Sequence, residues 1–178
     1  MQWLILDKAT PVSVIDALLA PLLAGKDTGL LSEAGCPAIA DPGALLVRAA
    51  HSKDIKIVPL IGPSSILLAL MASGLNGQRF RFHGYLPVRS EPRQCALRTL
   101  EQDSVKHHET QIFIETPYRN LQLYTDIVAV CAASTRLCIA TDLTAGSEKI
   151  EVATLAEWRR RQPPQIHRRP SIFLLAAA

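Results

Sequence analysis

The sequence predicts an α/β fold built as two small domains. Apolar runs of strand length alternate with segments whose apolar residues recur at helical spacing, and turn signals separate the two. The 178 residues are 48% hydrophobic and 20% charged, which allows a buried core and excludes a disordered polyelectrolyte. The pattern breaks at residues 84–87 (Gly-Tyr-Leu-Pro), so we expect an N-terminal domain over residues 1–80 and a C-terminal domain over residues 81–178.

Three apolar runs of the N-terminal half are expected to be strands, each followed by a helix. The strands are predicted over residues 2–6, 28–32 and 56–60, and the helices start at Thr10–Pro11, Asp41–Pro42 and Ser64–Ser65. Hydroxyl and carboxylate side chains cap helices, and proline is favoured in the first turn. Repeated strand–helix units predict a parallel sheet with its functional loops at the carboxyl ends of the strands.

The C-terminal half alternates in the same way. We expect helices over residues 96–100, 121–130 and 155–161, and strands over residues 111–115, 137–141 and 171–175. Because strands and helices alternate, the second domain is also expected to be α/β. The alternation has no fixed period, which disfavours a repeat protein.

Several functional classes are disfavoured by what the sequence lacks. The uncharged stretch 57–78 is interrupted by proline and glycine, so we expect no membrane span, and no secretory signal opens the chain, which favours the cytoplasm. The four cysteines form no C-x-x-C pair and are expected to be reduced thiols, with no metal site. No G-x-S-x-G elbow supports a hydrolase.

Arginines concentrate in two groups that are able to meet phosphates, although solvated helix faces would give the same pattern. The first group lies between residues 79 and 98, and the second contains Arg159, Arg160, Arg161, Arg168 and Arg169. The net charge of +3 by itself indicates no polyanionic partner.

Four loops at strand ends carry small or polar residues and are expected to converge on one cleft. They cover residues 32–43, 61–65, 115–119 and 142–144. The first loop lacks lysine and arginine, which disfavours a phosphate cradle. There we expect Asp41 to cap a helix and Glu33 to contact a ligand.

The motifs at residues 31–43, 58–65, 84–87 and 115–119 together resemble the tetrapyrrole methylase superfamily, and are most similar to its ribosomal RNA small subunit methyltransferase I branch. The resemblance implies two α/β domains with S-adenosylmethionine in the cleft between them, usually in a homodimer. It also implies transfer of a methyl group to a cytidine ribose 2′-hydroxyl of 16S rRNA, with rRNA or a ribosomal subunit as partner. The alternatives are a precorrin-type tetrapyrrole C-methyltransferase and a truncated, non-catalytic cofactor-binding module.

Carried over position by position, the resemblance implies a set of cofactor contacts but no identified catalytic residue. These contacts are Glu33, Cys36, Ser64, Ser65, Ile66, Tyr85, Thr116, Leu143, Pro170, Ser171 and Ile172. Two positions depart from the family, since Glu33 replaces an aspartate and Cys36 a threonine. The family's first strand and glycine-rich loop would precede residue 2, so we expect a fragment, a misplaced start or a shortened relative.

Overall fold

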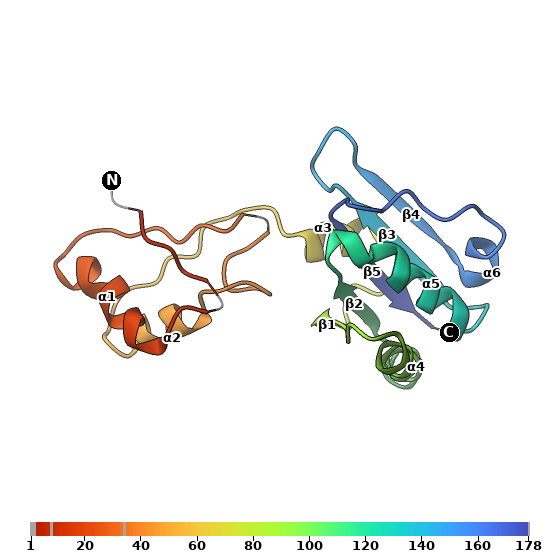
Figure 1. Cartoon of the computed structure of the whole chain (residues 1–178), viewed down its shortest axis with the longest axis horizontal. Helices are drawn as coiled ribbons and strands as arrows, with labels where there is room; N and C mark the ends of the chain where they lie inside the picture. The colour runs from red at the N-terminus through yellow and green to blue at the C-terminus, as the bar shows by residue number, and fades with distance from the viewer. Residues whose placement is uncertain (1–2, 8, 34, 178) are drawn as a thin grey trace. The chain divides into compact units, whose positions relative to one another are not determined.

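The computed structural model describes residues 3–7, 9–33 and 35–177. Contacts within the chain divide it into two compact units, unit 1 (Met1–Ser64) and unit 2 (Ser65–Ala178), which are described separately (Figure 1). The division after Ser64 rests on the density of contacts, whereas the boundary expected at residue 80 rests on a change in the sequence pattern. The domain boundary expected at residue 80 therefore stays a prediction.

Unit 1 is organised around two helices, α1 (Val12–Leu23) and α2 (Ala44–His51). α1 begins directly after Thr10–Pro11, as predicted, and Pro21 is accommodated in its last turn. The two helices pack against each other around a small core of Ile15, Leu18, Leu19 and Ala50. Side chains at helical spacing thus supply the buried face of α1.

The prediction of three strands in unit 1 is wrong. Residues 3–6, 28–32 and 56–60 form no strand, while Gln2 lies outside the described residues. Apolar side chains on these segments face solvent: Ile5 is 84% exposed, Leu31 72% and Leu60 86%. A strand needs a neighbour that accepts and donates its backbone hydrogen bonds, and the described part of unit 1 supplies none. Asp41 also does not cap α2, whose N-cap is Gly43.

Unit 2 contains one sheet and most of the regular structure. Its helices are α3 (Ser65–Ser73), α4 (Ser90–His107), α5 (Asn120–Val130) and α6 (Leu155–Trp158), with a 3₁₀ turn, η1, at Pro117–Arg119. Its strands are β1 (Phe80–Tyr85), β2 (Thr110–Ile114), β3 (Arg136–Thr141), β4 (Lys149–Thr154) and β5 (Ser171–Ala176). These elements confirm the predicted α/β class and every strand and helix predicted after residue 110.

β4 was not predicted, although Lys149, Ile150, Glu151 and Val152 alternate polar and apolar side chains as a strand would. It is an edge strand of the sheet, and Lys149 pairs with Glu151 at 3.0 Å. Its partner strand β3 lies antiparallel to it and supplies the complementary backbone groups. An edge strand with charged side chains is a common device against edge-to-edge association.

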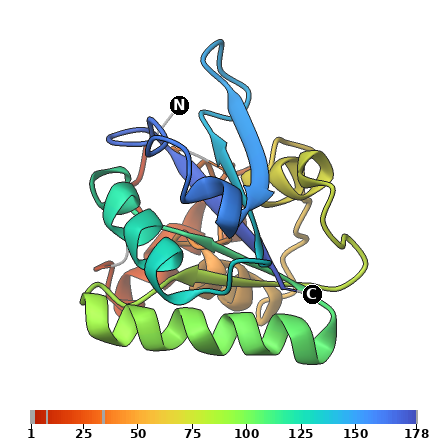
Figure 2. The same ribbon diagram turned by 90° about the vertical axis from the view of Figure 1, so that its right-hand side faces the viewer.

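The strand order β1-β2-β5-β3-β4 decides which loops share an edge of the sheet. β1 and β2 are parallel, whereas β5 runs antiparallel to both β2 and β3. The carboxyl ends of β1, β2 and β3 therefore lie at the same edge as the amino end of β5. Figure 2 presents unit 2 with the long hairpin of β3 and β4 at the top.

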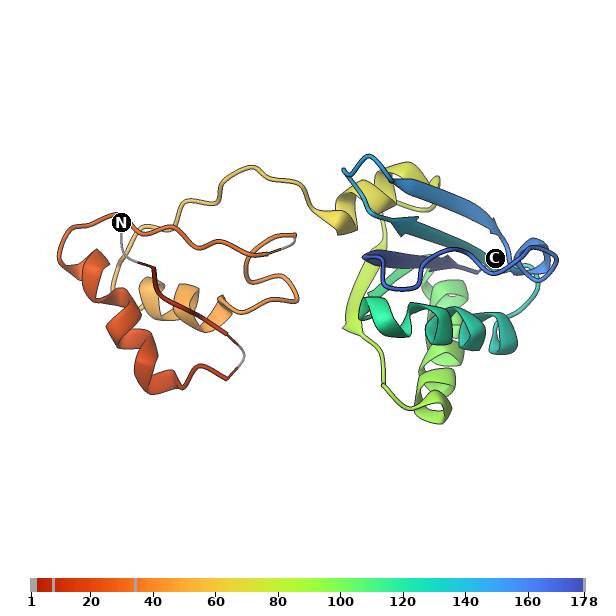
Figure 3. The ribbon, with the colours of Figure 1, turned by 45° about the horizontal axis from the view of Figure 1, so that its top comes forward.

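Helices cover both faces of this sheet, making three layers (Figure 3). On one face, α4, α5 and α6 pack around Phe113 and Phe173, whose rings stack with centroids 6.0 Å apart. On the other face, α3 packs against Ile112 and Ile172. Successive residues of a strand point to opposite faces, and the apolar runs Ile112–Ile114 of β2 and Ile172–Leu175 of β5 reflect burial of both faces.

Candidate functional site

The candidate cofactor contacts are divided between the two units. Unit 1 holds Glu33, Cys36 and Ser64. Unit 2 holds Ser65, Ile66, Tyr85, Thr116, Leu143, Pro170, Ser171 and Ile172.

In unit 1, the loop after residue 32 lies against the segment that leads into α3. The Cys36 thiol donates to the carbonyl oxygen of Pro63, with the sulfur 3.7 Å from it, and Glu33 is exposed. Gly43 closes this loop at a φ of 139°, where a Cβ would meet Leu30 at 2.9 Å. The close approach requires glycine. The Cys36–Pro63 hydrogen bond is the contact that joins two of the predicted loops within unit 1.

In unit 2, the predicted residues meet at one edge of the sheet because the strands are in register. Tyr85 of β1 pairs with Ile114 of β2, Ile114 pairs with Ile172 of β5, and Ile172 pairs with Ala140 of β3. One residue beyond Ile114 stands Glu115, followed by Thr116. Chain segments separated by up to 87 positions thus end side by side, as the strand-end argument expected for this half.

The loop after β3 joins this edge and faces α3. The Asp142 amide donates to the carbonyl oxygen of Pro170 at 2.9 Å, which fastens the β3 end to the segment entering β5. Leu143 lines a shallow hollow with Met71 of α3 and Ile150 of β4. Ile66, in the first turn of α3, packs on the same face of the sheet, whereas the adjacent Ser65 is exposed. The edge therefore offers both apolar and hydroxyl-bearing side chains.

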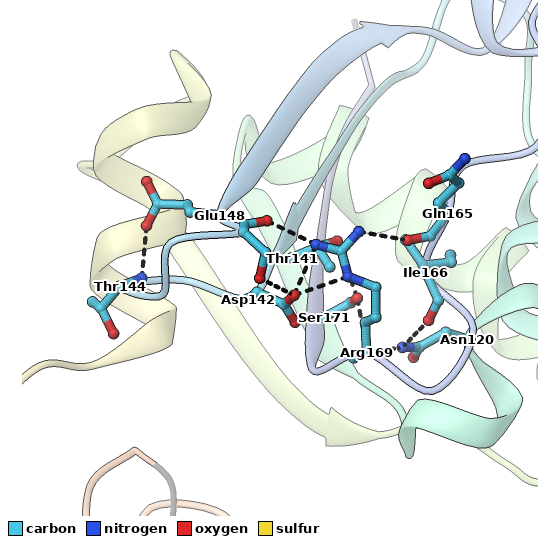
Figure 4. A network of polar contacts seen from close by, with 10 residues as sticks. Asn120, Thr141, Asp142, Thr144, Glu148, Gln165, Ile166, Arg169 and Ser171 are labelled. Atoms are coloured by element: carbon cyan, nitrogen blue, oxygen red, sulfur yellow. Dashed lines mark hydrogen bonds and ion pairs between the residues drawn. The ribbon is translucent and has the colours of Figure 1, made fainter.

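A hydrogen-bond network around Arg169 holds the two loops together (Figure 4). Its guanidinium donates to the Asp142 carboxylate at 2.7 and 2.9 Å, to the Ser147 carbonyl oxygen at 2.7 Å and to the Gln165 carbonyl oxygen at 3.0 Å. Hydrogen bonds from Ser147 and Arg169 hold the pKa of Asp142 below its usual range. This network is invisible in the sequence, since Asp142 and Arg169 are 27 positions apart and only the sheet brings them together.

The turn after β2 contains buried polar atoms with incomplete hydrogen bonding. Glu115, 5% exposed, accepts through Oε1 from the Thr116 amide at 2.6 Å and from Arg119 at 2.7 Å. Among the described residues, Glu115 Oε2, Arg119 Nε and Asn120 Oδ1 are buried and have no hydrogen-bond partner. Buried polar groups are normally paired, so this cluster marks a place where polar ligand groups are accommodated at low cost. The hydrogen bond with Glu115 raises the pKa of Arg119.

Most arginines of the second basic group make contacts with other parts of the protein. Arg159 donates to the carbonyl oxygens of Val128 and Cys131 at the end of α5, and Arg161 lies 5.4 Å from the ring centroid of Trp158. Arg169 is half-buried in the Asp142 network, whereas Arg159, Arg160, Arg161 and Arg168 are exposed. Within this group, Arg169 is thus the arginine whose charge is paired with a carboxylate inside the fold.

Arg93 of the first basic group is also structural. It is 3% exposed, and its Nη2 lies 2.5 Å from the carboxylate of Asp126, which ties α4 to α5. Burial raises the pKa of Asp126, but hydrogen bonds from Gln94, Ser90 and Arg93 outweigh burial and lower it.

Metal and membrane chemistry find no support in the described part of the chain. Residues 3–7, 9–33 and 35–177 contain no cluster of three metal-ligating side chains. Within the same ranges, no helix combines the length and apolarity needed to cross a bilayer. All four cysteines are free thiols, and burial raises the pKa of both Cys131 and Cys138 to about 12.

Comparison with known proteins gives sequence relatives that share one name. The chain is 40% identical over 142 residues to a ribosomal RNA small subunit methyltransferase I of Escherichia coli O157:H7, covering 80% of the chain and 48% of the relative. It is 32% identical over 163 residues to the protein of that name from Xylella fastidiosa, covering 92% and 58%. The chain thus spans about half the length of the curated relatives it matches. No family model matches the chain.

Comparison with solved structures gives the fold. The methyltransferase CobJ superposes with a TM-score of 0.65 at 17% identity, covering 97% of this chain and 73% of CobJ. The cobalamin biosynthetic enzyme cobalt precorrin-4 methyltransferase, CbiF, superposes with a TM-score of 0.55, also at 17% identity, covering 95% and 72%. At this identity the likeness establishes the architecture and leaves the chemistry to the site.

Proposed function

We propose that the chain is part of an S-adenosylmethionine-dependent methyltransferase. It is homologous to ribosomal RNA small subunit methyltransferase I over about half the length of those proteins, and it shares the tetrapyrrole methylase fold. Its substrate is a ribose 2′-hydroxyl of small-subunit rRNA. In this proposal the protein acts in the cytoplasm, where rRNA is available, and it acts as a homodimer.

The observation that carries the proposal is the convergence at the sheet edge of unit 2. Tyr85, Thr116, Leu143 and the segment 170–172 come from four strand ends that the register aligns. The Thr116 hydroxyl makes no hydrogen bond with the rest of the described chain, and the orphaned polar atoms of Glu115, Arg119 and Asn120 lie in the same turn. A ligand that carries both polar groups and an apolar ring fits such an edge.

In this proposal, the residues of the chain bind and orient the methyl donor. S-adenosylmethionine, when bound, supplies an electrophilic methyl group on a sulfonium. Thr116 offers a hydroxyl, while Leu143 and Ile66 offer apolar contact, and the Asp142–Arg169 network holds the loops that carry Leu143 and Pro170. Methyl transfer depends mainly on holding donor and acceptor in line, so rigid loops are the contribution expected from this unit.

Titration calorimetry of the 178-residue chain with S-adenosylmethionine tests the proposal. We expect Thr116→Val to weaken binding by about fivefold to tenfold, the worth of about one hydrogen bond. Thr125→Val is the matched control, because Thr125 is an exposed threonine on α5 whose hydroxyl bonds only to the Leu121 carbonyl oxygen.

Equal affinities for Thr116→Val, Thr125→Val and the unchanged chain would remove Thr116 from the site. Absence of any binding to the unchanged chain would contradict the proposal for this length of chain. Methyl transfer to small ribosomal subunits, followed with labelled donor, then tests the acceptor.

A further inference from the structure

An exposed guanidinium lies over an exposed aromatic ring beside the candidate cofactor edge. Tyr118 of η1 is 68% exposed, more than any other described aromatic residue of unit 2. The Cζ of Arg168 lies 5.7 Å from the centroid of its ring. An exposed ring by itself is ordinary, but a ring paired with a cation presents two distinct recognition surfaces at one place.

Hydrogen bonds between the η1 turn and the loop before β5 hold this pair in position. The Arg168 amide donates to the carbonyl oxygen of Pro117 at 3.0 Å, and the Asn120 side chain donates to the carbonyl oxygens of Ile166 and Arg169 at 3.2 and 2.7 Å. Arg168 itself has a φ of 59°, in the left-handed region that disfavours residues with side chains. Its placement over the ring is therefore imposed by the loop.

The Arg168 guanidinium keeps its hydrogen-bond donors. The guanidinium groups of Arg159 and Arg169, from the same basic group, donate hydrogen bonds to carbonyl and carboxylate oxygens. Within the described ranges, no acceptor or carboxylate is paired with the Arg168 guanidinium, whose contact is with the face of the Tyr118 ring. A planar guanidinium with free donors is suited to a phosphate.

Ring and cation together match the chemistry of an unpaired nucleotide. Proteins recognise single-stranded RNA by stacking bases on aromatic side chains and binding the backbone with basic groups, whereas the bases of an RNA duplex are inaccessible to stacking. Tyr118 is two residues from Thr116, and Arg168 is two residues from Pro170. A nucleotide on this pair would therefore lie beside the loops proposed to hold the methyl donor.

We propose that Tyr118 and Arg168 form a docking platform for a single-stranded segment of the substrate RNA, with an unpaired base on the Tyr118 ring and the adjacent phosphate on the Arg168 guanidinium. This inference rests on the proposed function, since it names the surface that receives the RNA. It assigns these two residues a role in binding the acceptor and none in binding the donor.

Fluorescence anisotropy with the 178-residue chain and a labelled single-stranded RNA of about 12 nucleotides tests the platform. Tyr118→Ala should weaken binding about fivefold to 100-fold, while Tyr118→Phe, which keeps the stacking ring, should bind as the unchanged chain does. Arg168→Ala should weaken binding and lower the slope of log affinity against log salt by about 0.7. Arg160→Ala is the matched control: it removes an exposed arginine of the same group and should change affinity less than about twofold.

A second readout covers the case in which Tyr118→Ala disturbs the turn. In Tyr118→Trp, stacking of a base should quench the new tryptophan emission on addition of RNA, and a duplex of the same sequence should leave it unchanged. The urea midpoint of each variant reports whether unit 2 remains folded.

Three results would overturn the platform: unchanged affinity in Tyr118→Ala, equal loss in Arg160→Ala and Arg168→Ala, or equally effective competition by an acidic peptide. The last would indicate a protein partner. These results are distinguishable from failure of the proposed function, because donor binding is measured without RNA. A chain that binds S-adenosylmethionine but shows any of the three retains the proposed function and loses only the platform.

Discussion

Apolar runs of similar length have opposite fates in the two units. In unit 2, residues 171–176 form the central strand β5, with Phe173 and Leu174 fully buried. In unit 1, the runs at residues 3–6, 28–32 and 56–60 remain irregular, and Ile61, next to the last of them, is fully exposed. β5 has a strand on each side and helices on both faces, whereas the unit 1 core consists mainly of the contact between α1 and α2.

The difference shows that hydrophobicity and β propensity are insufficient to make a strand. Backbone N–H and C=O groups need partners in a neighbouring strand, and only a sheet covered by helices repays the entropy of ordering them. Unit 2 meets both conditions, and unit 1 keeps apolar side chains in solvent.

The largest contrast is expected between core positions and exposed apolar positions. Phe173→Ala should lower the free energy of unfolding of unit 2 by about 3–5 kcal/mol, because it removes a ring that stacks on Phe113 inside the core. Ile61→Ala in unit 1 should change it by less than about 0.5 kcal/mol. Urea unfolding followed by far-ultraviolet circular dichroism, which reports the helices of both units, measures both. Similar shifts in the two variants would show that the runs of unit 1 are packed in solution.

Removing one carboxylate of an ion pair should also destabilise unit 2 more than unit 1. Asp126→Asn leaves the buried Arg93 without its carboxylate and should cost about 3–5 kcal/mol. Asp16→Asn in unit 1 removes an exposed carboxylate that lies 3.2 Å from Lys53 and should cost less than about 1 kcal/mol. Urea midpoints of both variants give the comparison.

The Asp126 contribution should depend on pH in a defined direction. The pKa of Asp126 in the folded protein lies below its ordinary value of 3.8, so the folded state favours the ionised form. Its stabilisation is complete well above pH 3.8 and is lost as the pH falls through the lower, folded pKa. The gap in unfolding free energy between Asp126→Asn and the unchanged chain should shrink over that interval. A gap that widens toward acid would contradict the assignment.

The rates at which the four cysteine thiols react provide a comparison that requires no substitution. Cys131 and Cys138 are buried in unit 2, and desolvation raises the pKa of each thiol to about 12, so little thiolate exists near neutral pH. In the folded chain, a disulfide reagent should modify the exposed Cys95 quickly, the half-buried Cys36 more slowly, and the other two only after unfolding. Rapid reaction of all four in native buffer would show that the sheet opens readily.

The candidate site was predictable in part. Strand-end reasoning placed Thr116 and Leu143 just after strands, and the structure has them after β2 and β3, whose carboxyl ends lie on the same side of the sheet with β5 between them. The roles of these residues as cofactor contacts, and those of Glu33, Cys36 and Ser64 in unit 1, stay predictions. The Arg169–Asp142 network and the paired Tyr118 and Arg168 were invisible, because each joins positions far apart in the chain.

Local chemistry is enough to start α1 after Thr10–Pro11, to give α5 its helical spacing of apolar residues and to mark β5 as a continuous apolar run. Packing decided that β4 pairs with β3, that Arg93 and Arg169 serve the fold while Arg168 faces solvent, and that three apolar runs of unit 1 form no strand. The physical reason is the range of the interactions: capping and helical spacing act within a few residues, whereas sheet hydrogen bonds and buried ion pairs depend on partners that only the folded chain brings within reach.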